Sequence, residues 1–400
     1  MKTLLVKLLL GAVLLAGHSS SSLAGEWYRG DLHAHSTYSD GDSSVADMIA
    51  RAESLGFDFF TLTDHDTSLS GTPVHWSDPA YYSHSMIILY GVEWTTASGH
   101  ANIWAKAPFS YKELWQAHEA LSAEDAIAAA HRQGALFSIN HPSSYVFTAP
   151  WEYPAYEGAD SVEVWNALYR LPSLNGWAGH VFWDGLLISG RRIPCVGGSD
   201  THMLKGWMAL FYGIGNPTTW VYAEDRTADA LLEGIKAGHA SISYAPDAVR
   251  LDFKADADAD GDFETAMGES ISGAGQSITF NVRIVQPGDT EPPQAGKIVE
   301  LDAVIVKMLE DGTITENDII TFIAPGQPYA YLAGVFKNGS LVRVWLLFSG
   351  AGSVTFKDKP SSSAYYRVEL VGNPRVSPMK QLLYGKIIAL TNPIYVDVSE

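Results

Sequence analysis

A short stretch near the start of the chain, RGDLHAHSTYSDGDSS from Arg29 to Ser44, is dense in histidine and carboxylate residues. His33 and His35 flank the small Ala34, and Asp40 follows them in the same stretch. Side chains two residues apart in a strand point to the same face. His33 and His35 would therefore present two imidazoles to one side. Neutral imidazole and carboxylate are ligands that suit Zn, Mn or Fe.

A second stretch, GGSDTH, repeats this spacing with Asp200 and His202 on either side of Thr201. A single pair of this kind is a weak indication, because such pairs arise by chance and most histidines are not ligands. Further candidate ligands follow strand-like segments in TDHD (63–66), GVE (91–93) and NHP (140–142). Together these motifs predict a metal cluster rather than isolated structural histidines.

The first part of the chain alternates strand-like and helix-like segments. Short buried strands are expected over 57–65, 86–94, 135–142, 160–166 and 193–200. Helices are expected over 43–56 and 122–134, because each begins at serine, has apolar residues at helical spacing and ends at glycine. This alternation predicts a mainly parallel sheet, open or closed into a barrel. In a β/α barrel the catalytic groups lie at the C-terminal strand ends, where these motifs fall.

The composition of the chain changes near residue 245. All 13 histidines lie at or before His239, which places the metal-type chemistry in the first part. The later sequence shows period-2 alternation between Gly, Pro and Asn turns, as in SITFNVRIV and LVRVWLLFSG. We therefore expect a domain over 25–245 that carries the chemistry, followed by an all-β, sandwich-like domain over 246–400.

The first 24 residues have the pattern of a secretory signal peptide. Lys2 and Lys7 accompany the apolar run LLLGAVLLAG, which is too short to span a bilayer, and Ser22 and Ala24 are small residues before a cut. We expect a protein exported to the periplasm or the medium, with no membrane span in the mature chain. A retained N-terminal membrane anchor is the alternative.

The charge and cysteine content exclude some classes of protein. The formal net charge is −19 at pH 7, and a surface this acidic repels polyanions, so no nucleic acid polymer is expected as a partner. No protein partner can be inferred. Cys195 is the only cysteine, which excludes an intramolecular disulfide, and packing in a buried strand is its favoured role over nucleophilic catalysis.

The motifs DLHAHSTYSDG, TDHD, GVEWTTASGHANIW, NHP and GGSDTH resemble, in this order, those of the PHP (polymerase and histidinol phosphatase) metal-dependent hydrolases. The resemblance covers roughly residues 28–245. The stretches GHANIW, VEVWN, GRRIPCVGGSDTH and LTNPIYV look closest to the carbaryl-hydrolase-like branch. The resemblance implies an α/β fold, a distorted seven-stranded β/α barrel, with two or three divalent metal ions clustered in it.

The same resemblance implies which residues hold each metal ion. The first metal would be held by His33, His35, Glu93 and Asp200. The second metal, which shares Glu93 as a bridge, would be held by His100 and His141. The third metal would be held by Asp40, His65 and His202, although a two-metal arrangement can leave Asp40 out. Among these ligands we expect Glu93, Asp200 and His202 to carry catalysis.

The expected chemistry follows from such a cluster. A water shared by the metals loses its proton near neutral pH, because a bound cation can lower the pKa of water to about 7. We expect this metal-bound hydroxide to hydrolyse a small-molecule phosphoester, with no Ser or Cys nucleophile. Hydrolysis of a carbamate or aryl ester is the alternative activity. A binding protein, in which the metals are structural and the β-domain engages a glycan or cell-surface partner, is an alternative of another class.

Several further residues have a functional and a structural interpretation. Asp64, Asp66 and Asn140 flank expected ligands and either orient imidazoles or are solvated strand-end residues. Four cationic residues are candidates for binding a phosphate: Arg170, Arg191, Arg192 and Lys205. Cations at the C-terminus of a helix are the favoured interpretation of the GRR run.

Two other segments are also ambiguous. The aromatic residues of 145–183 either roof a small-molecule pocket or pack a loop against the barrel. In DADADGDFETAM, Asp256, Asp258 and Asp260 occupy positions 1, 3 and 5 of a calcium loop, but Met267 stands where the bidentate Glu is needed. Calcium binding and a solvated acidic linker both remain open for this run.

Overall fold

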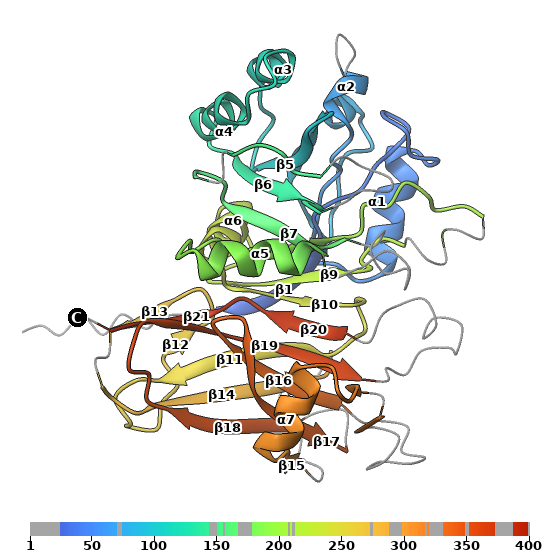
Figure 1. Cartoon of the computed structure of the whole chain (residues 1–400). Helices are drawn as coiled ribbons and strands as arrows, with labels where there is room; N and C mark the ends of the chain where they lie inside the picture. The colour runs from blue at the N-terminus through green and yellow to red at the C-terminus, as the bar shows by residue number, and fades with distance from the viewer. Residues whose placement is uncertain are drawn as a thin grey trace, which may run out of the picture.

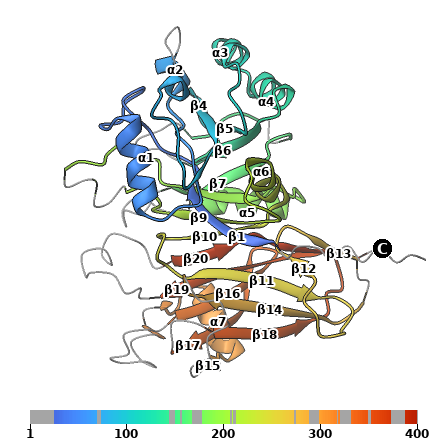
Figure 2. The same cartoon turned by 180° about the vertical axis from the view of Figure 1, so that it is seen from behind.

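The structure is a computed structural model that describes residues 25–69, 74–143, 150–154, 157–166, 178–206, 209, 213–272, 275–287, 298–316, 318–319, 331–348, 352–372 and 387–398. The upper half in Figure 1 mixes helices and strands. The lower half is rich in strands, with the helix α7 (Ala303–Glu310) packed on one side. The view from behind in Figure 2 shows the two halves joined along a layer of strands.

Strands and helices alternate through the first part of the chain. The strands are β1 (Glu26–Asp31), β2 (Phe59–Phe60), β3 (Ile87–Ile88), β4 (Tyr90–Thr96), β5 (Gly99–Ala105), β6 (Leu136–Asn140), β7 (Ser161–Asn166), β8 (Cys195–Gly198), β9 (Thr218–Ala223) and β10 (Ala240–Ser243). The helices are α1 (Val45–Ser54), α2 (Asp66–Leu69), α3 (Lys112–Glu119), α4 (Ala123–Arg132), α5 (Ala178–Ile188) and α6 (Ala228–Ala237), with a 3-10 helix over His75–Ser77.

Helices α1 and α4 begin at the serines that the sequence indicated. The Ser44 side chain accepts a hydrogen bond from the Asp47 amide, and the Asp47 side chain accepts one from the Ser44 amide, which forms a capping box. Ser122 caps α4 in the same position. Gly56 and Gly134 follow the two helices with φ of +68° and +70°, a conformation that glycine adopts without strain. The predicted helices over 43–56 and 122–134 are confirmed, with slightly shorter bounds.

The strands of this part belong to two sheets. Strands β4 to β8 form a five-stranded sheet in chain order, whereas β3, β2, β1, β9 and β10 belong to a 12-stranded sheet. The pairs β1–β2, β6–β7 and β7–β8 are parallel, as expected. The pairs β4–β5 and β5–β6 are antiparallel, because a tight turn after β4 leads into β5, a strand that the sequence analysis missed.

The closed seven-stranded barrel implied by the family resemblance is not confirmed. The described strands form a mixed α/β arrangement in which the two sheets meet through isolated parallel bridges. One bridge joins Ala34 to Thr201, and the other joins His65 to Glu93. Both bridges lie beside the candidate ligands, so the two sheets come together at the site itself.

The second part of the chain is built from strands. They are β11 (Arg250–Asp256), β12 (Thr265–Ala266), β13 (Ser270–Ser272), β14 (Ile278–Val285), β15 (Ile298–Glu300), β16 (Tyr331–Lys337), β17 (Ser340–Leu347), β18 (Gly352–Asp358), β19 (Ala364–Gly372), β20 (Ile387–Thr391) and β21 (Ile394–Asp397). A four-stranded sheet, β12-β11-β14-β18, packs against the large sheet. The rings of Phe280 on β14 and Tyr366 on β19 lie 4.5 Å apart between the two sheets. The second part is therefore rich in strands, as expected, but helix α7 shows that it is not all-β.

The 12-stranded sheet runs through both parts of the chain. β10 pairs antiparallel with β20, so a strand from near the C-terminus extends the sheet that contains β1. Buried Asn392, directly after β20, accepts a hydrogen bond from the Cys195 amide (2.7 Å) and donates one to the Cys195 carbonyl (2.9 Å). Strands from both sides of the predicted boundary at residue 245 therefore belong to one sheet. The division into two domains stays a prediction.

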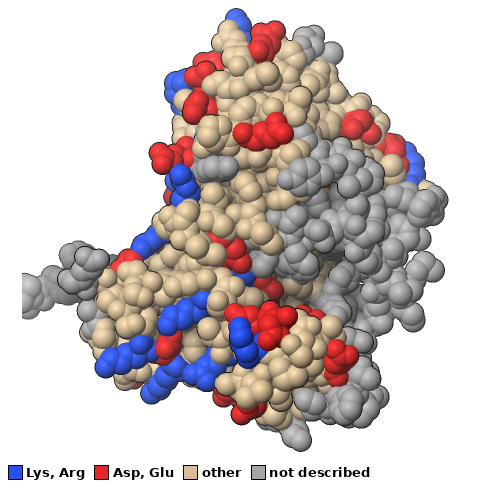
Figure 3. All heavy atoms as spheres, viewed as in Figure 1, with Lys and Arg blue, Asp and Glu red and all other residues tan. Residues whose placement is uncertain are grey.

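The surface carries charge unevenly, as Figure 3 shows. On the face in view, most of the visible Lys and Arg side chains gather over the strand-rich lower half, while acidic side chains are scattered over both halves.

Within the described residues, every helix is too short or too polar to cross a bilayer.

A buried ion pair also joins the two parts. Arg367 on β19 is fully buried and donates two hydrogen bonds to Asp184 on α5, from Nε (2.9 Å) and from a terminal nitrogen (2.7 Å). The other terminal nitrogen of Arg367 bonds to the Glu369 carboxylate. The guanidinium thus satisfies two carboxylates that have little access to water, and it holds α5 against β19.

We expect Arg367→Met to destabilise the protein strongly, because it leaves the buried Asp184 and Glu369 without their cation. Loss of one partner of a buried ion pair costs about 3–5 kcal/mol. The free energy of unfolding, measured by urea denaturation, should fall by that amount. Arg343→Met is the control, since the Arg343–Glu300 pair is exposed and should be worth about 0–1 kcal/mol. Equal effects of the two substitutions would contradict this account.

Candidate metal centre

The structure brings the candidate metal ligands together in one cluster. Their ligand atoms fall into four overlapping groups, each with all atoms within 4.8 Å of one another. The groups are His33–His35–Glu93, His33–His141–Asp200, Glu93–His100–His141 and His35–Asp40–His65–His202. All nine residues singled out from the sequence are in these groups.

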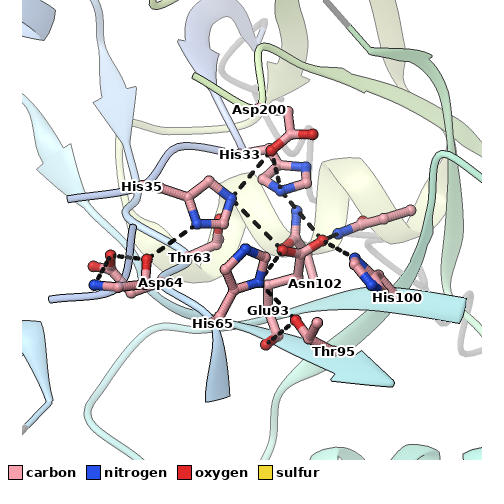
Figure 4. A network of polar contacts seen from close by, with 12 residues as sticks. His33, His35, Thr63, Asp64, His65, Glu93, Thr95, His100, Asn102 and Asp200 are labelled. Carbon is pink, nitrogen blue, oxygen red and sulfur yellow. Dashed lines mark hydrogen bonds and ion pairs between the residues drawn. The ribbon is translucent and has the colours of Figure 1, made fainter. Parts of the chain in front are cut away.

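The side chains reach this point from six strands or from the segments that follow them, as Figure 4 shows for several of them. His33 and His35 follow β1, His65 follows β2, and His141 follows β6. Glu93 and His100 lie within β4 and β5, and the Asp200–His202 segment follows β8. Strands of two sheets, and the segments that follow them, therefore place residues from 33 to 202 around one centre.

Glu93 lies at the middle of the cluster and is almost completely buried. Its Oε1 is 3.4 Å from His33, 3.3 Å from His100 and 3.2 Å from His141. Its Oε2 is 2.8 Å from His65 and 3.6 Å from His35. A single carboxylate thus faces five imidazoles, three through one oxygen and two through the other, which is the arrangement a bridging ligand needs.

Asp200 and Asp40 are placed differently from each other. Asp200 is buried, and its Oδ1 lies 3.2 Å from His33 and 3.1 Å from His35. The Asp40 side chain is 57% exposed, and its Oδ1 lies 3.2 Å from His202 and 3.6 Å from His65. Asp200 therefore belongs to the interior of the cluster, and Asp40 lies on its solvent side.

One ring nitrogen of several candidate ligands is occupied by a protein group. His33 Nδ1 lies 2.8 Å from the Glu163 carboxylate. His65 Nδ1 lies 2.7 Å from the Thr95 hydroxyl and 2.8 Å from Glu93 Oε2, while its Nε2 lies 3.6 Å from Asp40. His202 Nδ1 lies 2.9 Å from the Asp200 carbonyl oxygen. Such contacts fix the tautomer and orientation of a metal-binding imidazole. Each of these rings can therefore present Nε2 to a metal.

Glu163 is a site residue that the sequence analysis did not identify. It lies on β7 and is buried, with Oε1 on His33 and Oε2 accepting hydrogen bonds from the His141 amide (3.2 Å) and the Asn166 side chain (3.0 Å). A side chain at Gly198 would collide with both Glu163 and His33. The quoted VEVWN stretch contained the signal, an acidic residue within a buried strand next to β8.

The buried charges perturb one another strongly. Burial alone would raise the pKa of Glu93, but His33, His65 and His100 hold it well below its usual range. Burial, together with the charges of His202 and His65, lowers the pKa of His35 to about 3. Burial opposes the charged form of His202, yet Asp40 and Asp200 raise its pKa to about 9. Since metal ligands must be deprotonated, a metal bound here would displace protons.

The donor set fits divalent metal ions. His33 Nε2, His35 Nε2 and His100 Nδ1 are buried and make no hydrogen bond, although carboxylate oxygens lie 3.1 to 3.4 Å away. Buried polar atoms are normally paired. A cation bound between these three nitrogens and the carboxylates that they share would pair both kinds of group. Imidazole and carboxylate together suit Zn, Mn or Fe.

The residues that flank the ligands hold them in place rather than lying in solvent. Asn140 is buried and donates a hydrogen bond to Glu93 Oε1 (2.9 Å). Asp66 accepts one from the Thr95 amide (2.9 Å) and contacts His118. Asp64 accepts hydrogen bonds from two serines of the segment before Asp40. The orienting interpretation of these three residues agrees with their contacts.

The structure places the other cationic candidates away from the cluster or in structural contacts. Arg192 contacts Ser270 and Asp397 in the second part of the chain, and Arg191 contacts Glu157. The Lys205 ammonium donates to the Asp42 carbonyl. Arg170 lies outside the described residues.

The described aromatic residues of 145–183 pack in the core. Trp151 and Tyr153 are buried beside Trp94, with ring centroids 6.5 and 5.5 Å from it. Trp183 is also buried and donates a hydrogen bond to a backbone carbonyl. The pocket-roof interpretation gains no support from these rings, and the rest of the stretch lies largely outside the described residues.

Cys195 is buried in β8, and this burial raises the pKa of its thiol well above the usual value.

The acidic run brings its carboxylates together. Asp256, Asp258 and Asp260 form a group with Glu264 in which the ligand atoms lie within 4.8 Å of one another. The Asp256 carboxylate accepts hydrogen bonds from the amides of Ala259 and Gly261, so the loop is ordered by its own contacts.

Comparison with known proteins identifies the domain. Residues 31–139 match the model of the PHP domain, so the chain carries a PHP domain, and this match supports a metal-dependent hydrolase. The matched span contains six of the nine candidate ligands and ends before His141. No curated protein matches this chain.

Solved structures with some similarity to this chain include the following three. A two-domain protein of Bacteroides vulgatus containing a predicted PHP-like metal-dependent phosphoesterase is 16% identical, with 92% of this chain and 95% of that chain covered and a TM-score of 0.42. A candidate metal-dependent phosphoesterase of Bifidobacterium adolescentis is 16% identical over 46% of this chain and 90% of its own, with a TM-score of 0.33. An amidohydrolase of Chromobacterium violaceum is 18% identical over 44% and 87%, with a TM-score of 0.29.

Glu163→Gln should weaken metal binding without removing a ligand. A glutamine side chain has only one acceptor oxygen. If this oxygen accepts from His33, the His141 amide and the Asn166 side chain lose their acceptor, and if it accepts from those two donors, His33 loses its acceptor. Loss of such a supporting contact typically costs 10–100-fold in metal affinity. Equilibrium dialysis with Zn²⁺ or Mn²⁺ measures this change. The exposed Glu124→Gln is the control, and an unchanged affinity in Glu163→Gln would refute the role of Glu163.

Proposed function

Because the chain carries a PHP domain, we propose that it is a metal-dependent hydrolase that cleaves phosphoesters of small molecules. The observation that supports this most directly is the buried Glu93 carboxylate, which faces five imidazoles. Divalent ions bound by this set would supply Lewis acidity and lower the pKa of a bound water to about 7. The net acidic surface favours a small substrate over a nucleic acid polymer.

We further propose that the site holds two or three ions. Glu93 and Asp200 would bring two anionic charges to the buried pair of positions, where His33, His35, His100 and His141 supply nitrogen ligands. Asp40, His65 and His202 would complete a third position on the solvent side. Glu93, Asp200 and His202 are the residues that we expect to act closest to the reacting bond, because Glu93 belongs to two groups and the Asp200–His202 contact (3.6 Å) links two others.

The finer architecture follows the same proposal. We propose that β1, β2, β4, β5, β6, β7 and β8 act as one distorted barrel, closed at the site by the two isolated bridges. The bridges Ala34–Thr201 and His65–Glu93 support this closure. The second part of the chain, from residue 246, would then be a support that fixes β8 and β10 through β20 and Asn392.

Glu93→Ala and Asp40→Ala should differ in how much metal they remove. The first substitution takes a bridging ligand from two positions, so it should lose most bound metal and nearly all turnover. The second takes one exposed ligand, so it should lose about one metal and keep some activity. Elemental analysis per chain, together with turnover of a phosphate-ester panel and an aryl-ester panel, measures both effects.

The same experiment can refute the proposal. A wild-type protein that binds one metal at saturation would exclude a bridging Glu93. A Glu93→Ala protein with full metal and full rate would have the same consequence. Turnover of aryl esters or carbamates alone would replace the phosphoesterase activity by the alternative one, and no turnover of either class would favour a binding protein.

Export is a separate proposal that rests on residues 1–24, which lie outside the described residues. The basic residues, the short apolar run and the small residues at Ser22 and Ala24 support cleavage after Ala24. The exported protein should begin at Gly25. Sequencing its N-terminus tests this directly, and recovery of Met1 would show that the segment is retained.

A further inference from the structure

Asp64, which precedes His65 in the sequence, makes four hydrogen bonds to the segment before Asp40. It is completely buried, and its Oδ1 accepts hydrogen bonds from the Ser36 amide (2.8 Å), the Ser39 amide (3.1 Å) and the Ser39 hydroxyl (2.6 Å). Its Oδ2 accepts one from the Ser36 hydroxyl (2.8 Å). Four donors from two serines thus converge on one carboxylate.

The other side of Asp64 faces a buried histidine. His75 is fully buried, and its Nδ1 lies 3.0 Å from Asp64 Oδ2. The His75 ring also packs against Trp76 and Tyr81, with centroids 5.1 Å apart in both pairs. Asp64 is therefore fixed from behind by an aromatic cluster and cannot follow the serines if they move.

The segment held in this way carries Asp40. The Asp40 carboxylate contacts three imidazoles, those of His202, His65 and His35, at 3.2 to 3.8 Å. Its side chain is 57% exposed, so packing around the carboxylate contributes little to its position. The backbone on either side of Asp40 must therefore set where this ligand lies.

That backbone is folded tightly against the segment that carries His33 and His35. The Gly41 amide donates a hydrogen bond to the Ser36 carbonyl (2.9 Å), and a side chain at Gly41 would collide with the His35 carbonyl. Beyond it, the Asp42 carboxylate accepts hydrogen bonds from the amides of Leu204 and Lys205. Asp42 ties the far end of the segment to the His202 region, and Asp64 ties the near end to the His65 region.

Ser39 links the same carboxylate to a second ligand. His35 Nδ1 lies 3.4 Å from the Ser39 hydroxyl, which donates its hydrogen to Asp64. The Asp64–Ser39 contact thus supports the orientation of the His35 ring and the position of Asp40 at once. His33 has an independent support, since Glu163 contacts it directly.

We propose that Asp64 is a positioning residue for the third metal position, because it holds segment 36–42 so that Asp40 can complete that position. The inference rests on the proposed metal cluster and adds that one buried carboxylate, which is not itself a ligand, controls occupancy of the solvent-side position. The buried pair of positions depends on Asp64 only through His35, because its other ligands Glu93, Asp200, His33 and His141 have other supports.

The test compares metal binding by the full chain in four forms: wild type, Asp40→Ala, Asp64→Asn and Asp160→Asn. Asp160 is the matched control, a buried aspartate that accepts a hydrogen bond from the Phe137 amide and contacts His131, away from segment 36–42. Zn²⁺ is titrated into metal-free protein, and metal per chain is measured by elemental analysis after dialysis. The melting temperature of each metal-free variant reports whether it is folded.

Wild type and Asp160→Asn should bind three Zn²⁺ per chain, and Asp40→Ala should bind two. Asp64→Asn should bind two Zn²⁺ with close to wild-type affinity, because only His35 among their ligands loses a support, and the third about 10–100-fold more weakly, as expected when a supporting contact is lost. Ser39→Ala keeps the Asp64 charge and should weaken the third position in the same direction. It decides the question if Asp64→Asn does not fold.

Three results would overturn the inference. Asp64→Asn could hold the third Zn²⁺ with wild-type affinity, it could lose all three ions while folded, or the wild type could bind only two. Phosphoester turnover is measured separately on wild type. Its absence would refute the proposed activity but would leave the dependence of the third metal on Asp64 measurable.

Discussion

The burial of Glu93 among five imidazoles is the interaction on which the rest of the site depends. A carboxylate without water is costly unless it is paired, and here no lysine or arginine among the described residues contacts it. Imidazoles compensate it only if they are protonated or if cations lie between. Since several of their inward nitrogens make no hydrogen bond, shared metal ions, as proposed above, would satisfy both groups at once.

This constraint accounts for the structure around the cluster. Glu163, Thr95 and Asp64 hold the ligands from behind, so the ligand atoms stay close in spite of their mutual repulsion. The second part of the chain supports the strands that carry these ligands. Asn392 contacts the backbone of β8, which leads into Asp200, and the Arg367–Asp184 ion pair fixes α5 beside it. Both parts of the chain therefore contribute to the rigidity of one site.

The local features of this protein could be predicted from the sequence, and the long-range ones could not. The capping serines of α1 and α4 and the spacing of His33 and His35 are signals within a few residues of each other. Strand β5 and the pairing of β10 with β20 depend on segments that meet only in the fold. Glu163 was missed for the same reason, because its role arises from the contact of β7 with the end of β1.

The most direct test of the central claim is anomalous X-ray diffraction at the zinc absorption edge from crystals of the zinc-loaded protein. The account predicts two strong peaks on either side of the Glu93 carboxylate, each at bonding distance, about 2.0–2.2 Å, from a carboxylate oxygen and a histidine nitrogen. A third peak is predicted beside Asp40 and His202. No peak within bonding distance of Glu93, or a single peak held by Asp40 alone, would contradict the account.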